Sequence, residues 1–550
     1  MSGDMPMPLR WLVALAVAAA LGIGFWAWIG RGIDLPPAPS PKLACLSYTP
    51  FQGAQTPYDP SLVIPPEQIA ADLDRLQPVT DCIRIYATDQ GIDATVPLAA
   101  ERGMQVLLGI WVGSDAALYE KQIARAIELA QAHPAAIKAI IVGNEVLLRG
   151  EQSGETLAEL VLRVKAATGL PTTYADVWGF WQKAPQALVD AVDFLTIHLL
   201  PYWEDDPAPA EAAIQHLDFV LETMQAQFPG KALMVGETGW PSAGRAREDA
   251  VPSLTEQAKY LRLFMRDVDA RGIDYNIIEA FDQPWKRHQE GAVGGYWGVF
   301  DGARMAKFDW TGPVSNHPDW PWKAGLSLLI GLACLGLARF RLPSSSPLAG
   351  EGFASALLGA VLAGAGGSAI MLQLERAALI AVSRLDAAIE AALILQSLLV
   401  LTLALRGSAQ LATAPLAAAT DWLRAPRRRA APLALVALLR ALVLGGAALV
   451  ALALCFDGRY RGFPLATYGL PAILFLVLQC RAGRLLGAIA DGREERLLSA
   501  IFLGCALFLP WWEGFNNAEA LAFAAILLAF ALGLAGAWRR APANPVIAGA

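Results

Sequence analysis

Two glutamates, each placed at the end of an apolar run, are the residues of this sequence best suited to catalysis. Glu145 follows the apolar part of "IKAIIVGNEV", residues 137–146, and Glu237 lies within "KALMVGETGWPSAG", residues 231–244. A buried carboxylate is costly unless it is hydrogen-bonded or paired, so either glutamate alone would most simply be structural. Two of them favour a catalytic pair.

Retaining glycoside chemistry requires such a pair. One carboxylate attacks the anomeric carbon, and the other protonates the leaving oxygen and later deprotonates the acceptor. The two groups need unequal acidities, so we expect one carboxyl to be ionised and the other protonated near neutral pH.

The elements that must position these glutamates are eight short strand-like runs that alternate with helical stretches such as residues 115–133. The runs lie near residues 43–48, 82–86, 104–111, 138–145, 171–176, 193–199, 232–237 and 275–281. This alternation predicts an α/β fold, a (β/α)8 TIM barrel, whose chemistry lies at the carboxyl ends of the strands. Glu145 would end the fourth strand and Glu237 the seventh, so both would face the same rim.

Five segments, in order, resemble those of glycoside hydrolase family 17, the β-1,3-glucanase-like retaining enzymes. "IIVGNEV" and "MVGETGWPSAG" look like its two signature segments. "CIRIYATD", "DFLTIHLLPYWE" and "EAFDQPWK" resemble other strand-end segments of the family, and the resemblance covers about residues 43–312. It implies that Glu145 is the acid/base and Glu237 the nucleophile, and that Asn144 binds the sugar 2-hydroxyl.

The expected substrate-binding set also includes aromatic and polar residues at or after the strand ends, since aromatic faces stack on sugar rings. Soluble members of the family often have an acidic residue at the position of Gln283. We expect about half of the rim aromatics to line the cleft, and no metal or cofactor. The full set is Asn144, Tyr48, Tyr86, Asp176, Trp178, Tyr202, Trp203, Trp240, Gln283, Lys286 and Trp297.

The composition requires that part of the chain lie in a membrane. Of its 550 residues, 55% are hydrophobic and 17% are charged, which is too apolar for a wholly soluble protein. Residues 11–29 form an uncharged stretch that ends in bulky residues, which favours a retained anchor over a cleaved signal peptide. Seven further apolar spans are expected near residues 324–340, 353–371, 387–405, 432–455, 464–480, 497–512 and 518–538.

The expected organisation is a barrel followed by an all-α multi-span transmembrane bundle. Its parts are an anchor (1–30), a Pro-rich linker (31–42), the catalytic barrel (43–312), an interfacial linker (313–323), about seven helices (324–540) and a tail (541–550). Fourteen arginines fall in short connections on one side of the bundle, against five on the other: Arg31, Arg376, Arg384, Arg459 and Arg461. This bias predicts cytoplasmic termini and a barrel outside the cytoplasm.

Location and partners follow from this topology and from the resemblance. We expect a multi-pass protein of the bacterial inner membrane with a periplasmic catalytic domain, in contact with the lipid bilayer, a β-glucan and a glucan synthase. The net charge of −7 gives no support to nucleic-acid binding. Cys45 and Cys82 either form a disulfide or remain two buried thiols.

Charged residues also occur near the predicted spans. Most of them fit a solvated or interfacial position, whereas Arg440 is the exception. They are Glu375, Arg376, Arg384, Asp386, Glu390 and Arg440.

Two functions of different classes remain. The first is a membrane-anchored β-glucan hydrolase or glucanosyltransferase that takes part in β-(1,3)/(1,6)-glucan synthesis or remodelling, as membrane-attached bacterial members of the family do. The second is a non-catalytic glucan-binding or export component that uses the barrel as a holding module. The presence of both glutamates favours the enzyme, because a holding module has no need of the pair.

Overall fold

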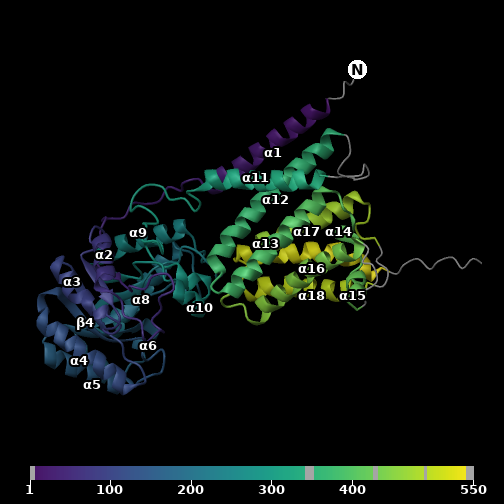
Figure 1. Ribbon diagram of the computed structural model, residues 1–550. Helices are drawn as coiled ribbons and strands as arrows, with labels where there is room; N and C mark the ends of the chain where they lie inside the picture. Colours follow the sequence, from purple (N-terminus) through teal and green to yellow (C-terminus); the bar gives the residue numbers. More distant parts are fainter. Residues whose placement is uncertain (1–5, 341–351, 425–431, 488–491, 540–550) are drawn as a thin grey trace, which may run out of the picture. The chain divides into compact units, whose positions relative to one another are not determined.

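The computed structural model describes residues 6–340, 352–424, 432–487 and 492–539 (Figure 1). The chain divides into two compact units. One is Gly32–Ser315, and the other is formed by Met1–Arg31 together with Asn316–Ala550.

The first unit is a closed barrel of eight parallel strands, in which strands that follow one another in sequence are neighbours. This confirms the (β/α)8 prediction. The strands are β1 (Leu46–Ser47), β2 (Cys82–Ile85), β3 (Gln105–Ile110), β4 (Ile137–Asn144), β5 (Thr172–Val177), β6 (Phe194–His198), β7 (Ala232–Thr238) and β8 (Asp274–Ile277).

Helices surround these strands, and local capping fixes where they begin and end. At α5 the Ser153 hydroxyl accepts the backbone N–H of Thr156, and the helix ends at Gly169 in a left-handed conformation with φ of 66°. Such caps satisfy backbone groups that the helix leaves unpaired. The helices are α2 (Pro66–Leu76), α3 (Thr95–Glu101), α4 (Ala116–Ala132), α5 (Gly154–Thr168), α6 (Trp178–Trp181), α7 (Gln186–Ala191), α8 (Ala212–Gln227), α9 (Leu254–Arg271) and α10 (Arg287–Glu290).

The interior of the barrel changes from apolar to polar along the strands. Near the amino ends, Cys45 and Cys82 form a disulfide between neighbouring strands, within a cluster that includes Leu107 and Met234. The sequence left a disulfide and free thiols open, and the structure shows the disulfide. Farther along the strands, polar side chains form hydrogen bonds across the barrel interior, and the charged groups follow at the rim.

The Pro-rich segment after residue 31 packs on the barrel. Ile33 pairs with Val314 in an antiparallel bridge, and the N–H of Ala38 donates to the carbonyl of Trp310 at 2.9 Å. The Arg262 guanidinium, which is buried, also donates to the Pro36 carbonyl. The compact unit therefore begins earlier than the expected boundary at residue 43.

The second unit is helical, and within the part of it that the structure describes, seven helices are long and apolar enough to cross a membrane. The remaining expected span, near residues 464–480, is α17, a shorter apolar helix of 17 residues with Pro471 inside it. The helices are α1 (Met7–Ile29), α11 (Trp320–Arg339), α12 (Phe353–Ile380), α13 (Arg384–Leu405), α14 (Gln410–Thr413), α15 (Ala417–Arg424), α16 (Pro432–Phe456), α17 (Leu465–Arg481), α18 (Arg493–Trp512) and α19 (Ala518–Leu534).

Small residues bring α1 close to α11 and α12. Ala14 and Ala18 of α1 pack against Ala356 and Ala360 of α12, because small side chains let two helix backbones approach closely. Near the other end of α1, the indole of Trp26 donates to the hydroxyl of Ser327 at 3.0 Å. The first apolar helix is thus an integral part of the helical unit.

The charges near the predicted spans have structural partners. The Arg376 guanidinium donates to Glu390 at 3.0 Å, Glu375 pairs with Lys323, and Asp386 takes part in the capping box that starts α13. Arg384 is exposed.

Arg440, the expected exception, is buried and pairs with Glu495 at 3.3 Å. Its guanidinium also bonds the Ala414 carbonyl, and Glu495 accepts the N–H of Leu416 at 2.8 Å. The pair therefore satisfies non-helical backbone between α14 and α15, as buried backbone requires when no water is present.

Candidate active site

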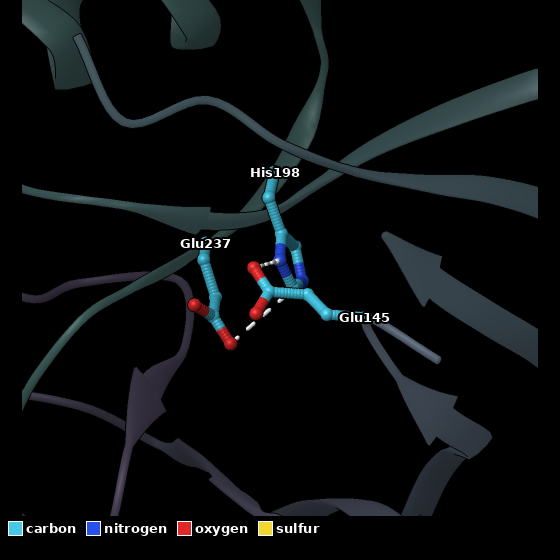
Figure 2. A group of neighbouring side chains, drawn as sticks. All are labelled: Glu145, His198 and Glu237. Atoms are coloured by element: carbon cyan, nitrogen blue, oxygen red, sulfur yellow. Dashed lines mark hydrogen bonds and ion pairs between the residues drawn. The ribbon is translucent and has the colours of Figure 1, made fainter. Parts of the chain in front are cut away.

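The two glutamates meet at the carboxyl rim of the barrel, with His198 of β6 beside them. Glu145 directly follows β4 and has a left-handed φ of 52°, so the chain turns out of the strand at this residue. One donor atom from each of Glu145, His198 and Glu237 can be chosen so that all three lie within 4.8 Å of one another. Figure 2 shows the carboxylates of Glu145 and Glu237 next to the imidazole of His198, with a dashed line from the ring to each of them.

Glu237 is held by a chain of hydrogen-bond donors from the barrel interior. The Tyr86 hydroxyl donates to Glu237 Oε1 at 2.8 Å, and the Arg84 guanidinium lies 3.3 Å from the same oxygen. The amide of Asn276 donates to Ser47, whose hydroxyl lies 2.7 Å from that of Tyr86. Because Tyr86 gives its single proton to Glu237, Ser47 must donate to Tyr86. The network fixes one carboxylate oxygen and leaves the side chain 6% exposed at the rim.

Glu145 is more exposed and has a different environment. His198 Nδ1 lies 3.0 Å from Glu145 Oε1, and 24% of the Glu145 side chain is exposed. Burial by itself raises the pKa of the Glu145 carboxyl. The hydrogen bond and charge of His198, together with the charges of Arg149 and Arg84, outweigh burial and lower that pKa. Glu145 in this arrangement therefore does not meet the expectation of a carboxyl that is protonated near neutral pH.

Asp176 supports the turn that carries Glu145. Its side chain is fully buried, and it accepts the hydroxyl of Tyr174 and the backbone N–H groups of Leu147 and Leu148. Burial is the main cause that raises the pKa of Asp176. In the structure Asp176 holds the segment after Glu145, and its expected contact with substrate stays a prediction.

The comparisons with known proteins agree with this geometry. Residues 45–298 match the BtgE/BtgC glycoside hydrolase domain. The chain is 29% identical over 259 residues to the glucan 1,3-beta-glucosidase BGL2 of Candida albicans, covering 43% of this chain and 84% of that protein. These matches support the predicted resemblance of the barrel to glycoside hydrolase family 17.

Two further proteins are similar to this barrel. A glucan 1,3-beta-glucosidase of Schizosaccharomyces pombe is 28% identical over 259 residues, covering 44% of this chain and 79% of that protein. The solved structure of an active-site mutant of the Rhizomucor miehei beta-1,3-glucanosyltransferase, in complex with laminaritriose, covers 48% of this chain and 95% of its own chain, with 26% identity and a TM-score of 0.43.

Within this family 17-like barrel, five of the expected substrate-binding side chains are partly exposed. They are Tyr86, Asn144, Trp178, Trp203 and Lys286. Lys286 Nζ lies 2.9 Å from both carboxyl oxygens of the buried Glu279. Burial by itself lowers the pKa of Lys286, but the charges of Glu279 and Glu290 outweigh it and raise that pKa. Lys286 is therefore a fixed cation.

Five more of the expected residues are buried and bond to the barrel itself. The Tyr48 hydroxyl donates to Asp72 of α2 at 3.2 Å. Three others donate to backbone carbonyls: Tyr202 to that of Arg245, Trp240 to that of Val251 and Gln283 to that of Thr49. The fifth, Trp297, stacks on Trp203. These side chains support the rim, and the expectation that they contact substrate stays a prediction.

The sequence analysis missed two residues that contact the glutamate pair, Arg84 and His198. Arg84 is a charge within the otherwise apolar "CIRI", and it alternates with Tyr86, so both point to the same side of β2. A charge inside a buried strand was a usable signal. His198 carried no comparable signal, because a single histidine at a strand end is commonly structural.

Glutamate and histidine also occur together in metal sites, but the charges here are already balanced by the protein. Glu237 Oε1 accepts the Tyr86 hydroxyl and faces the Arg84 guanidinium at 3.3 Å, so the positive charge that this carboxylate needs is present in the barrel. What the arrangement can do chemically is attack a carbon with one carboxylate and exchange a proton with the other.

Proposed function

We propose that this chain is a membrane-anchored retaining enzyme that transfers glucosyl units of β-1,3-glucan to a sugar acceptor. The observation that supports this most is the spacing of the glutamates, whose nearest oxygens lie within 4.8 Å. Retaining glycosidases place their carboxyl groups about 5–5.5 Å apart, whereas inverting enzymes need about 6.5–9.5 Å to admit a water.

The roles of the two glutamates follow from their surroundings. Glu237, held by Tyr86 and Arg84, is the nucleophile, because a fixed and charge-stabilised oxygen can attack in a constant direction. Glu145, which is more exposed and bonded to His198, is the acid/base. Asn144 lies next to Glu145 and contacts Arg84, and we assign it to the 2-hydroxyl of the bound sugar.

The substrate class is supported by the relatives and by the aromatic rim. The two relatives described above are glucan 1,3-beta-glucosidases. Trp178 and Trp203 are partly exposed, and aromatic faces of this kind stack on sugar rings and exclude water. Exclusion of water favours a sugar acceptor over hydrolysis.

We also propose that the barrel lies outside the cytoplasm, in the periplasm of a bacterium, and is attached to the inner membrane at both ends. The arginine bias of the connections supports this orientation. So does the Cys45–Cys82 disulfide, because disulfides persist in oxidising compartments. An enzyme tethered in this way meets a glucan that emerges beside it at high effective concentration, so a glucan synthase is a fitting partner.

The test is to incubate the purified full chain in detergent with laminaripentaose and to measure the sizes of the products. Products longer than the donor would support transfer. Only shorter sugars and new reducing ends would show a hydrolase and would remove the transfer proposal. Binding without turnover would favour a holding module. Glu237→Gln serves as the inactive control.

A further inference from the structure

His198 lies beside the two carboxylates and faces both of them. Its side chain is fully buried, with Nδ1 3.0 Å from Glu145 Oε1 and Nε2 3.7 Å from Glu237 Oε1. The other ionisable groups that interact with the two glutamates are Asp176 of β5, Arg84 of β2, Tyr86 directly after β2, Arg149 of the loop after β4, Lys286 and Glu290.

The backbone around His198 fixes its ring. A Cβ atom on residue 236 would lie 3.1 Å from Cδ2 and 3.3 Å from Nε2 of His198, so Gly236 is what allows the imidazole to pack here. The ring is therefore held by close packing as well as by its hydrogen bond.

The hydrogen bond also indicates which nitrogen carries a proton. An ionised carboxylate only accepts hydrogen bonds, so Nδ1, which faces Glu145 Oε1, is the donor. Among the described residues, Nε2 has no hydrogen-bond partner. His198 thus presents its Nδ1–H to Glu145 and its Nε2 to Glu237, and its charge lowers the pKa of the Glu145 carboxyl.

We propose that His198 is a positioning residue that donates to Glu145 throughout the reaction and favours its ionised, proton-accepting form. Glu145 then activates an incoming sugar hydroxyl at lower pH than an isolated glutamate would. This inference rests on the proposed function, because it assumes that Glu145 is the acid/base of that reaction.

The proton balance of the two half-reactions is as follows. In the first, a Glu237 oxygen forms a bond to C1 while the C1–O bond breaks, and the leaving oxygen takes the proton of Glu145. In the second, Glu145 removes the proton of the acceptor hydroxyl as that oxygen bonds C1, and the C1–Glu237 ester bond breaks. His198 keeps its Nδ1 proton in both steps. Its donation stabilises the carboxylate that begins the second step.

The test uses His198→Asn in the full chain, since asparagine retains a neutral donor near the Nδ1 position but not the positive charge. Its control is His133→Asn, because His133 lies at the carboxyl end of α4, away from the rim that carries the two glutamates. Laminaripentaose, whose leaving group needs a proton, reports the first step. A dinitrophenyl β-laminaribioside, whose leaving group needs none, isolates the second step.

We expect two limits of the pH–rate profiles of His198→Asn to move upward by about one pH unit: the alkaline limit of the first step and the acid limit of the second. Without the charge of His198 the pKa of Glu145 rises, so the first step persists to higher pH. For the same reason the second step is lost at a higher pH on the acid side. The His133→Asn limits should coincide with those of the native chain. Slower turnover with unmoved limits would show a purely steric role and overturn the inference.

A second measurement does not depend on activity. In the full chain labelled with 15N-histidine, the His198 Nδ1–H signal, identified by its loss in His198→Asn, should exchange slowly with water. It should disappear in Glu145→Ala and remain in Glu237→Ala. Persistence in Glu145→Ala would overturn the inference, whereas full turnover by Glu237→Gln would overturn the proposed function alone.

Discussion

The barrel and the helical unit both contain buried charged side chains, but these side chains differ in their exposure and in their hydrogen-bond partners. In the barrel, Glu145 remains 24% exposed at the rim, and its partner His198 leaves Nε2 without a hydrogen bond. In the helical unit, the side chains of Arg440 and Glu495 are each 1% exposed, and they bond the backbone between α14 and α15. An ionisable residue in a predicted membrane span is by default a candidate functional residue. Here, however, the candidate catalytic site is the partly exposed cluster in the barrel, and the buried Arg440–Glu495 pair has a structural role.

The largest effect that would sharpen this contrast is expected from Glu237→Gln. The amide cannot serve as the nucleophile, so turnover of laminaripentaose should fall roughly 10⁴-fold, as when one member of a catalytic unit is removed. Product formation per folded molecule is the measurement. Glu101→Gln, an exposed substitution on α3, is the matched control and should keep full activity. Comparable loss in the control would point to a general defect.

Arg440→Met should act on stability alone. It leaves Glu495 as an unpaired buried charge, so the helical unit should lose roughly 3–5 kcal/mol, seen as a lower thermal midpoint in detergent. The double variant with Glu495→Leu should recover much of this loss. Arg384→Met, at an exposed position, is the control. If Arg440→Met instead abolished glucan turnover in a fully folded protein, the distinction between the two clusters would fail.

Arg84→Lys tests whether the charges of the barrel act through geometry. Lysine keeps the charge but cannot at once reach the Gly236 carbonyl, Asn144 and Glu237, as the Arg84 guanidinium does. Because a hydrogen bond to a charged group contributes about 1.5–3 kcal/mol, kcat should fall roughly 10–100-fold with little change in folding. The control is Arg102→Lys, whose partner Asp74 is exposed. Unchanged kcat would show that charge alone suffices.

The smallest effect is expected at the aromatic rim. Trp178→Ala should lower the ratio of transfer to hydrolysis products a few-fold at millimolar oligosaccharide, since a stacked ring contributes about 0.5–1.5 kcal/mol. Trp203→Ala should act in the same direction. Phe219→Ala, an exposed aromatic on α8, is the control. A ratio that stays constant in both tryptophan variants would place the acceptor elsewhere on the rim.

The sequence was sufficient for the barrel and for its two glutamates, because strand ends of a (β/α)8 fold share one rim. It was less informative about which strand-end aromatics face the cleft. Tyr48 and Trp240 stand at such ends, yet their side chains turn outward to Asp72 and to the Val251 carbonyl. The alternation of inward and outward side chains along a strand does not predict side-chain direction where the strand is only two residues long, as β1 is. It also fails where the register shifts, as in β7.

The partners of Arg440 could not be found from the sequence for a related reason. Arg440 donates to the carbonyl of Ala414, and its partner Glu495 accepts the N–H of Leu416; such backbone groups are the same in every residue type. Their exposure depends on where α14 ends, at Thr413, and apolar periodicity gives no sign of such a break. Arg84 and His198 were likewise defined by cross-barrel distances that only the closed sheet supplies.

The position of the barrel within the chain has a consequence for biosynthesis. α1 ends at Ile29 and its packing partner α11 begins at Trp320, so the whole barrel is synthesised between two helices that belong together. At about 5–20 residues per second, α1 waits roughly 15–60 s on the ribosome before α11 is made. In the membrane arrangement proposed above, α1 remains in the bilayer alone during that interval. Its mean hydropathy of 2.2 and the lack of any charge between residues 11 and 29 suit it to this wait.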